Sequence, residues 1–136
     1  MSDKSPLTQD VQLSALVVMS GSFDSIRKTV RHLCSQSARE VLEIVIITTN
    51  PKLVETSALE SAGAWQIVRV DQLPTSASGW AAGIRQARAP VVVLCEDHSF
   101  PEPAWAQSLI TAHQDRWSAV APAVENGNPE TLISWA

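Results

Sequence analysis

The sequence is poor in the features that mark several classes of protein. It contains no tyrosine, only two cysteines, two phenylalanines and five glycines, and its ten lysines and arginines nowhere form a run. Two cysteines without metal-ligand spacing exclude a disulfide framework and favour reduced, buried thiols in a cytoplasmic protein. Because there is no basic cluster and the net charge is −4, the sequence shows no electrostatic footprint for nucleic acid or an anionic membrane.

Long hydrophobic segments are absent as well. No apolar run approaches the ~20 residues of a membrane-spanning helix, and the first residues, MSDKSPLTQD, lack the apolar segment of a signal peptide. We therefore expect no transmembrane segment. Of the 136 residues, 45% are hydrophobic, which is enough for one packed domain. We expect residues 1–12 to be frayed and residues 13–136 to form this single domain.

Short apolar runs alternate with helical patterns along the chain. Runs that are apolar on both faces are typical of strands covered by helices on each side. Alternation of such strands with helices predicts an α/β domain with three layers, α/β/α, and a mainly parallel sheet. The expected strands cover 13–20, 41–49, 64–70, 91–95 and 117–124, and the expected helices begin at Ser22 or Asp24, at Asn50, at Trp80 and at Pro101.

Two details of the expected helices depend on single residues. Gly63 should end the second helix with a positive φ, as glycine often does after a helix. In the third helix, Trp80, Ile84 and Ala87 share one apolar stripe and should face the core.

Polar residues follow most of the predicted strands. In an open parallel sheet, the loops that leave the carboxyl ends of the strands form the ligand crevice, so these residues predict one shared site. For the first three loops, simple solvation of strand ends stays open as the alternative. The residues at these positions are Ser20, Gly21 and Ser22, then Thr48, Thr49 and Asn50, then Asp71 and Gln72, and finally Glu96, Asp97 and His98.

Glu96 and His98 favour a cation site at the end of the fourth strand. A carboxylate and an imidazole at i and i+2 of an extended segment project to the same side, while Asp97 points to the other. Oxygen and imidazole ligands suit Mn²⁺, Zn²⁺ or Fe²⁺ better than Mg²⁺. Because two protein ligands are too few to hold such an ion, we expect a ligand such as a diphosphate to complete its coordination.

Three stretches of the sequence, in this order, resemble the nucleotide-binding half of the family 2 glycosyltransferases. They are LSALVVMSGSFDSIRKTVRHLCSQS, EVLEIVIITTNP and GWAAGIRQARAPVVVLCEDHSFPEPAW, and together they span nearly the whole chain. The resemblance implies the nucleotide-diphospho-sugar transferase fold, which is GT-A and Rossmann-like. The matching elements are Gln36 at the end of the first helix, Gly83, Ile84 and Ala87 in the third helix, and Pro101, Pro103 and Trp105 after the acidic loop.

The resemblance also implies a function. It suggests a glycosyltransferase that binds a nucleotide-diphospho-sugar donor through a divalent metal, Mn²⁺ or Mg²⁺, and transfers the sugar to an acceptor that the sequence does not identify. Ser20 and Ser22 fall where the family contacts the base, and Thr48 and Thr49 replace its usual pair of aspartates. The implied nucleotide contacts are Ser20, Ser22, Thr48, Thr49 and Glu96, and the implied metal ligands are Glu96 and His98.

The sequence also departs from the family pattern. Trp80 and Ala81 replace an Arg-Asn pair, which removes a guanidinium that could hold phosphate. In the family, the acceptor pocket and the catalytic base lie beyond the metal motif, whereas this sequence ends at LISWA. We therefore expect an incomplete fold without an identifiable catalytic residue, whose apolar end could pair with a second copy of the chain.

Three other functional classes share the predicted α/β architecture. A noncatalytic α/β binding module, in which the strand-end loops dock a partner protein, stays open. A dinucleotide-binding Rossmann domain is disfavoured because the first turn, SGSFDS, lacks the three-glycine fingerprint. A receiver-like phosphoacceptor domain is disfavoured because the first strand ends in Ser-Gly-Ser in place of acidic residues.

Overall fold

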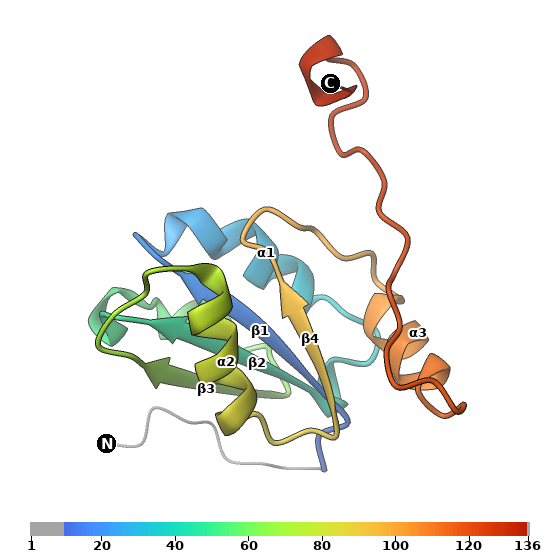
Figure 1. The fold of residues 1–136 in the computed structure, drawn as a ribbon, viewed down its shortest axis with the longest axis horizontal. Coiled ribbons are helices and arrows are strands. Elements are labelled where there is room, and N and C mark those ends of the chain that lie inside the picture. The colour runs from blue at the N-terminus through green and yellow to red at the C-terminus, as the bar shows by residue number, and fades with distance from the viewer. Residues whose placement is uncertain (1–9, 136) are drawn as a thin grey trace.

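The structure, a computed structural model, describes residues 10–135 and consists of a parallel sheet between two layers of helices (Figure 1). The four strands are arranged in the order β3-β2-β1-β4, so the three-layer α/β fold expected from the sequence is confirmed. The strands are β1 (Leu13–Met19), β2 (Leu42–Thr48), β3 (Ala64–Arg69) and β4 (Val91–Cys95); the helices are α1 (Asp24–Cys34), α2 (Ser76–Gln86) and α3 (Trp105–Ala112), with 3₁₀ helices η1 (Arg39–Val41), η2 (Pro51–Leu53), η3 (Thr56–Leu59) and η4 (Leu132–Trp135).

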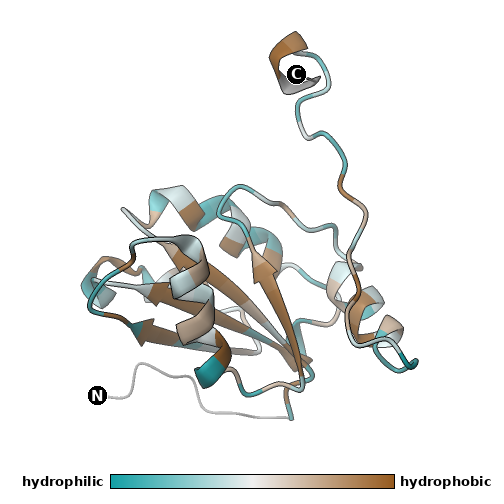
Figure 2. Cartoon of the chain, viewed as in Figure 1, coloured by the Kyte–Doolittle hydropathy of each residue, from teal (hydrophilic) through white to brown (hydrophobic). Residues whose placement is uncertain are grey.

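The core has two parts because alternate residues of each strand point to opposite faces of the sheet. On one face, Ala15 and Val17 of β1 pack with α1 and α3 in the larger cluster. On the other face, Leu16 packs with Val45 and Ile47 of β2 beneath α2. Since helices cover both faces, the strands are mostly apolar, and they are predominantly brown in Figure 2.

α2 approaches the sheet closely through glycines. A Cβ atom on Gly83 would lie 2.9 Å from Cδ1 of Ile47 and 3.1 Å from Cδ1 of Leu16. The expectation that Ile84 faces the core was wrong, because its side chain is 50% exposed. A side chain at Gly83 would force Ile47 and Leu16 to shift where the helix backbone meets the sheet, and this close packing turns Ile84 towards solvent.

Residues 50–63 form two 3₁₀ turns, η2 and η3, in place of the expected α-helix. Val54 has an extended backbone between the two turns, which lets it and Leu59 reach the larger core. Gly63 does not adopt a positive φ, so that expectation was also wrong. Its lack of a side chain instead makes room for the backbone of η1. Tertiary packing therefore overrides the helical pattern of this segment.

The ends of two other elements differ from the sequence expectation. Val11 is buried and the Gln12 N–H donates to the Val41 carbonyl at 2.8 Å, so the end of the segment expected to be frayed is held to the domain. Residues 1–9 of that segment lie outside the described residues. α3 begins at Trp105 and not at Pro101, because the side chain of Gln36 caps the N–H of Ala106 at 2.9 Å.

Residues 117–124 do not form the expected strand. Within the described residues, β4 pairs only with β1, and the chain after α3 runs away from the sheet (Figure 1). Pro122 also removes a backbone donor from this segment. The side chains of Val124, Leu132 and Ile133 are exposed, and their pairing with a second copy of the chain stays a prediction.

A buried polar network lies at the amino end of the sheet, on the face that α2 covers. The carboxylate of Glu43 is fully buried and accepts hydrogen bonds from Ser14 Oγ at 2.5 Å and Gln66 Nε2 at 2.8 Å. It also accepts from the Arg88 N–H at 3.0 Å and pairs with the Arg88 guanidinium. The sequence pattern, which describes β2 as apolar on both faces, did not reveal this network.

A helix that crosses a membrane must be both long and apolar. No helix of the described residues combines the length and the apolar character that a bilayer crossing requires.

Candidate functional site

A pocket of about 140 Å³ opens at the carboxyl ends of β1 and β4. From β1 the chain proceeds outward to β2 and β3, and α2 then carries it back across to β4 on the other side of β1. The pocket therefore lies where the strand order reverses, which is where open α/β sheets bind ligands. Its lining residues are Val18, Ser20, Ser76, Trp80, Cys95, Glu96, Asp97 and His98.

His98 lies between two carboxylates at the edge of this pocket. Its Nε2 is 3.1 Å from Oε2 of Glu96, and its Nδ1 is 2.8 Å from Oδ1 of Asp97. The structure thus brings Glu96 and His98 together, but Asp97 does not point to the opposite side as the sequence analysis expected. The reason is that β4 ends at Cys95 and a turn follows, in which the Ser99 N–H donates to the Glu96 carbonyl at 3.3 Å.

The two carboxylates act on the imidazole in different ways. The hydrogen bond with Asp97, together with the charges of both carboxylates, raises the pKa of His98 above its ordinary value. In the neutral ring, a hydrogen on Nδ1 directed at Asp97 leaves the lone pair on Nε2 facing Glu96. Nε2 and Oε2 then form a donor pair of the kind that suits Mn²⁺. Asp97 has a role that the sequence reasoning missed.

The pocket has a negative electrostatic character. Among the described residues, its lining contains Glu96 and Asp97 but neither lysine nor arginine. An anionic ligand would be repelled here unless a cation came with it. Among residues 10–135, no group of three or more His, Cys, Asp or Glu side chains is arranged to hold a metal. A cation at Glu96 and His98 would therefore need further ligands from a bound molecule or from water.

The remaining residues predicted for the site do not all reach the pocket. Ser20 lines the pocket. Ser22, which follows β1, and Thr49, which follows β2, are exposed and do not line it. Thr48 is buried, and its hydroxyl accepts the N–H of Asn50 at 3.2 Å. The Thr48 side chain is therefore buried and hydrogen-bonded within the protein, and it does not face the pocket.

α2 adds two lining residues that the sequence reasoning did not assign to the site. Ser76 is the first residue of the helix, so the partial positive charge of the helix amino end lies beside the pocket. Trp80 is partly buried, and its Nε1 has no hydrogen-bond partner among the described residues. The periodicity of α2 was visible in the sequence, but the path of the preceding loop, which brings its amino end here, was not.

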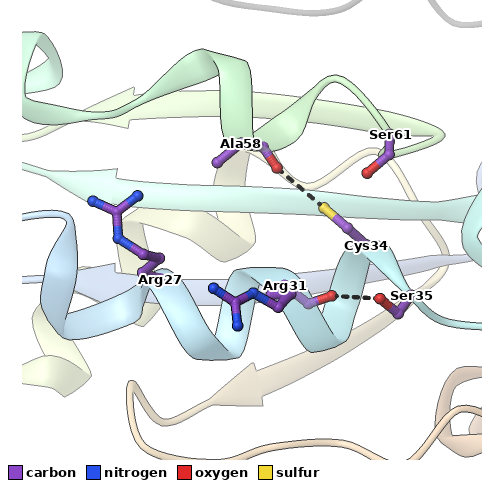
Figure 3. Close-up of a pocket in the computed structure, with 6 residues that line it drawn as sticks. All are labelled: Arg27, Arg31, Cys34, Ser35, Ala58 and Ser61. Atoms are coloured by element: carbon purple, nitrogen blue, oxygen red, sulfur yellow. Dashed lines mark hydrogen bonds between the residues drawn. The ribbon is translucent and has the colours of Figure 1, made fainter.

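A larger cavity, of about 230 Å³, lies between α1 and η3 (Figure 3). None of its lining residues follows the end of a strand. The charge of Arg27 is already matched by Asp24 at 2.7 Å and Glu55 at 2.6 Å, so it is not available to an anionic ligand. This cavity is therefore not the functional candidate. It is lined by Arg27, Arg31, Cys34, Ser35, Ala58 and Ser61.

The two cysteines are free, and both should react slowly with thiol reagents in the folded protein. Burial raises the pKa of Cys95 to about 12 and also raises the pKa of Cys34, so little reactive thiolate is present at about pH 8. DTNB should react fully with both thiols in denaturant, whereas in the native protein Cys34 should react slowly and Cys95, which burial affects more strongly, more slowly still. Immediate reaction of Cys95 would contradict this expectation.

The chain is similar to one protein family and to several solved structures. The profile of glycosyl transferase family 2 matches residues 14–135. The crystal structure of residues 1–349 of S. aureus TarS has a TM-score of 0.62 at 14% identity, over 76% of this chain and 33% of that chain. The mannosyltransferase PcManGT from Pyrobaculum calidifontis, in complex with GDP-Man and Mn²⁺, has a TM-score of 0.59 at 18% identity, over 84% of this chain and 35% of that chain.

These likenesses differ in what they establish. At such identities the solved structures support the fold alone, and this chain spans about a third of the length of each. No curated protein matches the sequence. The family profile, in contrast, covers nearly every residue and confirms the resemblance drawn from the sequence: the chain belongs to glycosyl transferase family 2.

Proposed function

We propose that this chain forms the donor-binding part of a glycosyltransferase and holds a nucleotide-diphospho-sugar through a divalent cation. One observation carries the proposal: Nε2 of His98 and Oε2 of Glu96 lie 3.1 Å apart in a pocket to which the described residues contribute neither lysine nor arginine. A diphosphate could bind there only with a cation. Membership of the family supports this function, as does the structural neighbour in complex with GDP-Man and Mn²⁺.

Glu96, Asp97 and His98 would each have a different role in holding the cation. Glu96 and His98 would supply the two protein ligands, and Asp97 would orient the imidazole through Nδ1. When bound, the cation would offset the negative charge that grows on the departing nucleoside diphosphate. Coordination needs the neutral ring, so protons and the cation compete for His98.

The nucleotide would extend beyond the pocket. A volume of about 140 Å³ is smaller than the ~300–1,000 Å³ of sites that enclose a whole drug-sized ligand, so the pocket suits the phosphate end of the donor. The base would lie over the neighbouring strand ends, where Ser20, Ser22 and Thr49 are exposed and can form hydrogen bonds. The buried Thr48 would support this edge by holding the N–H of Asn50.

The proposal does not assign the transfer step to a residue. Transfer requires a base that removes the proton of the acceptor hydroxyl, and the carboxylates that described residues place in the pocket lining are those of the proposed metal ligand Glu96 and its neighbour Asp97. We expect this chain alone to bind the donor without transferring the sugar. The two free cysteines support a cytoplasmic location.

Removal of either proposed metal ligand should abolish most cation-dependent nucleotide binding. Calorimetric titration of UDP and GDP at about pH 8, with and without Mn²⁺, should show binding to the wild type only when Mn²⁺ is present. Glu96→Ala and His98→Ala should each weaken that binding by at least roughly tenfold, because loss of an orienting group alone costs this much.

Matched variants control for general effects of charge and ring removal. Glu102→Ala removes an exposed carboxylate from the same loop, and His113→Ala removes an imidazole at the end of α3; neither residue lines the pocket, so both should bind like the wild type. Nucleotide binding that is absent, or that does not depend on Mn²⁺, would refute the proposal and favour a noncatalytic binding module.

A further inference from the structure

The turn that carries Glu96 and His98 is fastened to the middle of α1. The hydroxyl of Thr29, which is fully buried, lies 2.7 Å from the carbonyl oxygen of Asp97 and 3.0 Å from that of Ser99. These two carbonyls flank His98 on either side. Because β4 ends at Cys95, strand pairing does not hold this part of the backbone, and Thr29 supplies the contact that replaces it.

Gln36 holds the segment that follows. Its side chain is 1% exposed, and its Nε2 donates to the carbonyls of Pro101 at 3.3 Å and Glu102 at 2.8 Å, as well as to that of His32 at 3.2 Å. Its Oε1 accepts the N–H of Ala106 at 2.9 Å. One amide thus uses both its donor group and its acceptor, and it joins the end of α1 to the start of α3.

A third set of contacts lies between these two. His32 is in contact with Phe100 at 5.6 Å between ring centroids, and its Nδ1 is 3.3 Å from the Pro101 carbonyl. The ammonium group of Lys28 lies 3.8 Å from the centre of the Phe100 ring. Thr29, His32 and Gln36 are spaced i, i+3 and i+7, so they form one stripe along α1 and its end.

We propose that this α1 stripe (Thr29, His32 and Gln36) positions the Glu96–His98 turn for cation binding, with Thr29 as the main positioning residue. The inference rests on the proposed function of the site. Glu96 and His98 are well exposed and their side chains do not lock each other by packing. The apparent affinity for a cation rises with the fraction of molecules in which both ligands are in place, so a fixed turn backbone increases the affinity.

The test is a pair of variants at Thr29. Thr29→Val has nearly the same shape but lacks the hydroxyl, whereas Thr29→Ser retains it. Titration of Mn²⁺, alone and with GDP or UDP, should show affinity weakened on the order of tenfold in Thr29→Val. Thr29→Ser should bind close to the wild type. As a matched control, Thr111→Val removes an exposed threonine hydroxyl on α3 and should leave Mn²⁺ affinity unchanged.

A positioning role predicts two further results. Thr29→Val added to Glu96→Ala should cause no additional loss of Mn²⁺ affinity, because the effect of Thr29 passes through Glu96 and His98. Backbone amides of residues 97–105 should also exchange with deuterium faster in Thr29→Val than in the wild type, with or without Mn²⁺.

The outcomes separate the two proposals. A wild type that shows no Mn²⁺-dependent nucleotide binding would refute the proposed function and this inference together. If Thr29→Val binds Mn²⁺ with the affinity of the wild type, this inference is overturned while the proposed function stands, even if amide exchange in the turn is faster. Equal losses in Thr29→Val and Thr29→Ser that follow the fall in Tm would also overturn it, because they would indicate a general loss of stability.

Discussion

Glu43→Ala is expected to destabilise the fold by about 3 kcal/mol, the lower end of the cost of breaking a buried ion pair, because it leaves the partly buried Arg88 guanidinium at the amino end of the sheet without its carboxylate. The hydroxyl of Ser14, the amide of Gln66 and the N–H of Arg88 also lose their acceptor. A buried donor without a partner bears its full desolvation cost. Urea unfolding followed by circular dichroism measures the change in the free energy of unfolding.

Two variants make this result specific to the network. Glu60→Ala removes an exposed glutamate and should change the free energy of unfolding by no more than about 0.5 kcal/mol. The double variant Glu43→Met/Arg88→Met replaces both charges with apolar side chains and should recover part of the loss. If Glu43→Ala costs less than about 1 kcal/mol, water reaches the network and the carboxylate is not a structural anchor.

The network around Glu43 also contacts the carboxyl end of α2. Gln66 Nε2 also donates to the Gln86 carbonyl at 2.8 Å, and Arg88 lies two residues after the end of α2, so the network holds the carboxyl end of that helix. The opposite end of α2 supplies Ser76 and Trp80 to the pocket. We therefore expect Glu43 to influence the site through the placement of α2, although it lies at the other end of the sheet.

Gly63→Ala is expected to destabilise the fold by about 3 kcal/mol, at the upper end of what overpacking typically costs. A methyl group on Gly63 would overlap the carbonyl oxygen of Arg39 and lie 2.7 Å from Cα of Glu40. Both atoms belong to the backbone of η1, so no side chain can rotate away to relieve the clash. The free energy of unfolding in urea is again the measurement.

Gly21→Ala is the matched control, because no atom lies within 4 Å of the position its methyl group would take. Since Gly21 does not have a positive φ, this substitution should be neutral or stabilising by up to about 1 kcal/mol. Equal destabilisation by both substitutions would show that the cost at Gly63 does not come from contact with η1.

Much of the fold could be predicted from the sequence because it depends on local patterns. The range 91–95 of β4 was predicted without error, and the other three strands of the sheet within one residue at either end. Continuous apolar runs between helical patterns admit few arrangements other than a covered parallel sheet. The same rule placed Glu96 and His98 at the carboxyl edge, where the pocket lies.

Local patterns failed where long-range contacts decided the outcome. Residues 50–63 have the pattern of a helix, but burying both Val54 and Leu59 against the core requires two separate turns. Residues 117–124 have the pattern of a strand, but a strand also needs a neighbour, and the described residues offer none.

The sequence by itself determined the alternation of strands and helices, the family, and the end of the sheet at which the candidate pocket lies. Only the tertiary structure decided that a turn swings Asp97 onto His98, that α2 contributes Ser76 and Trp80, and that Thr29 holds the turn. The reason is physical. Periodicity records which face of each element is buried, whereas the meeting of side chains from separate elements depends on how closely those elements pack.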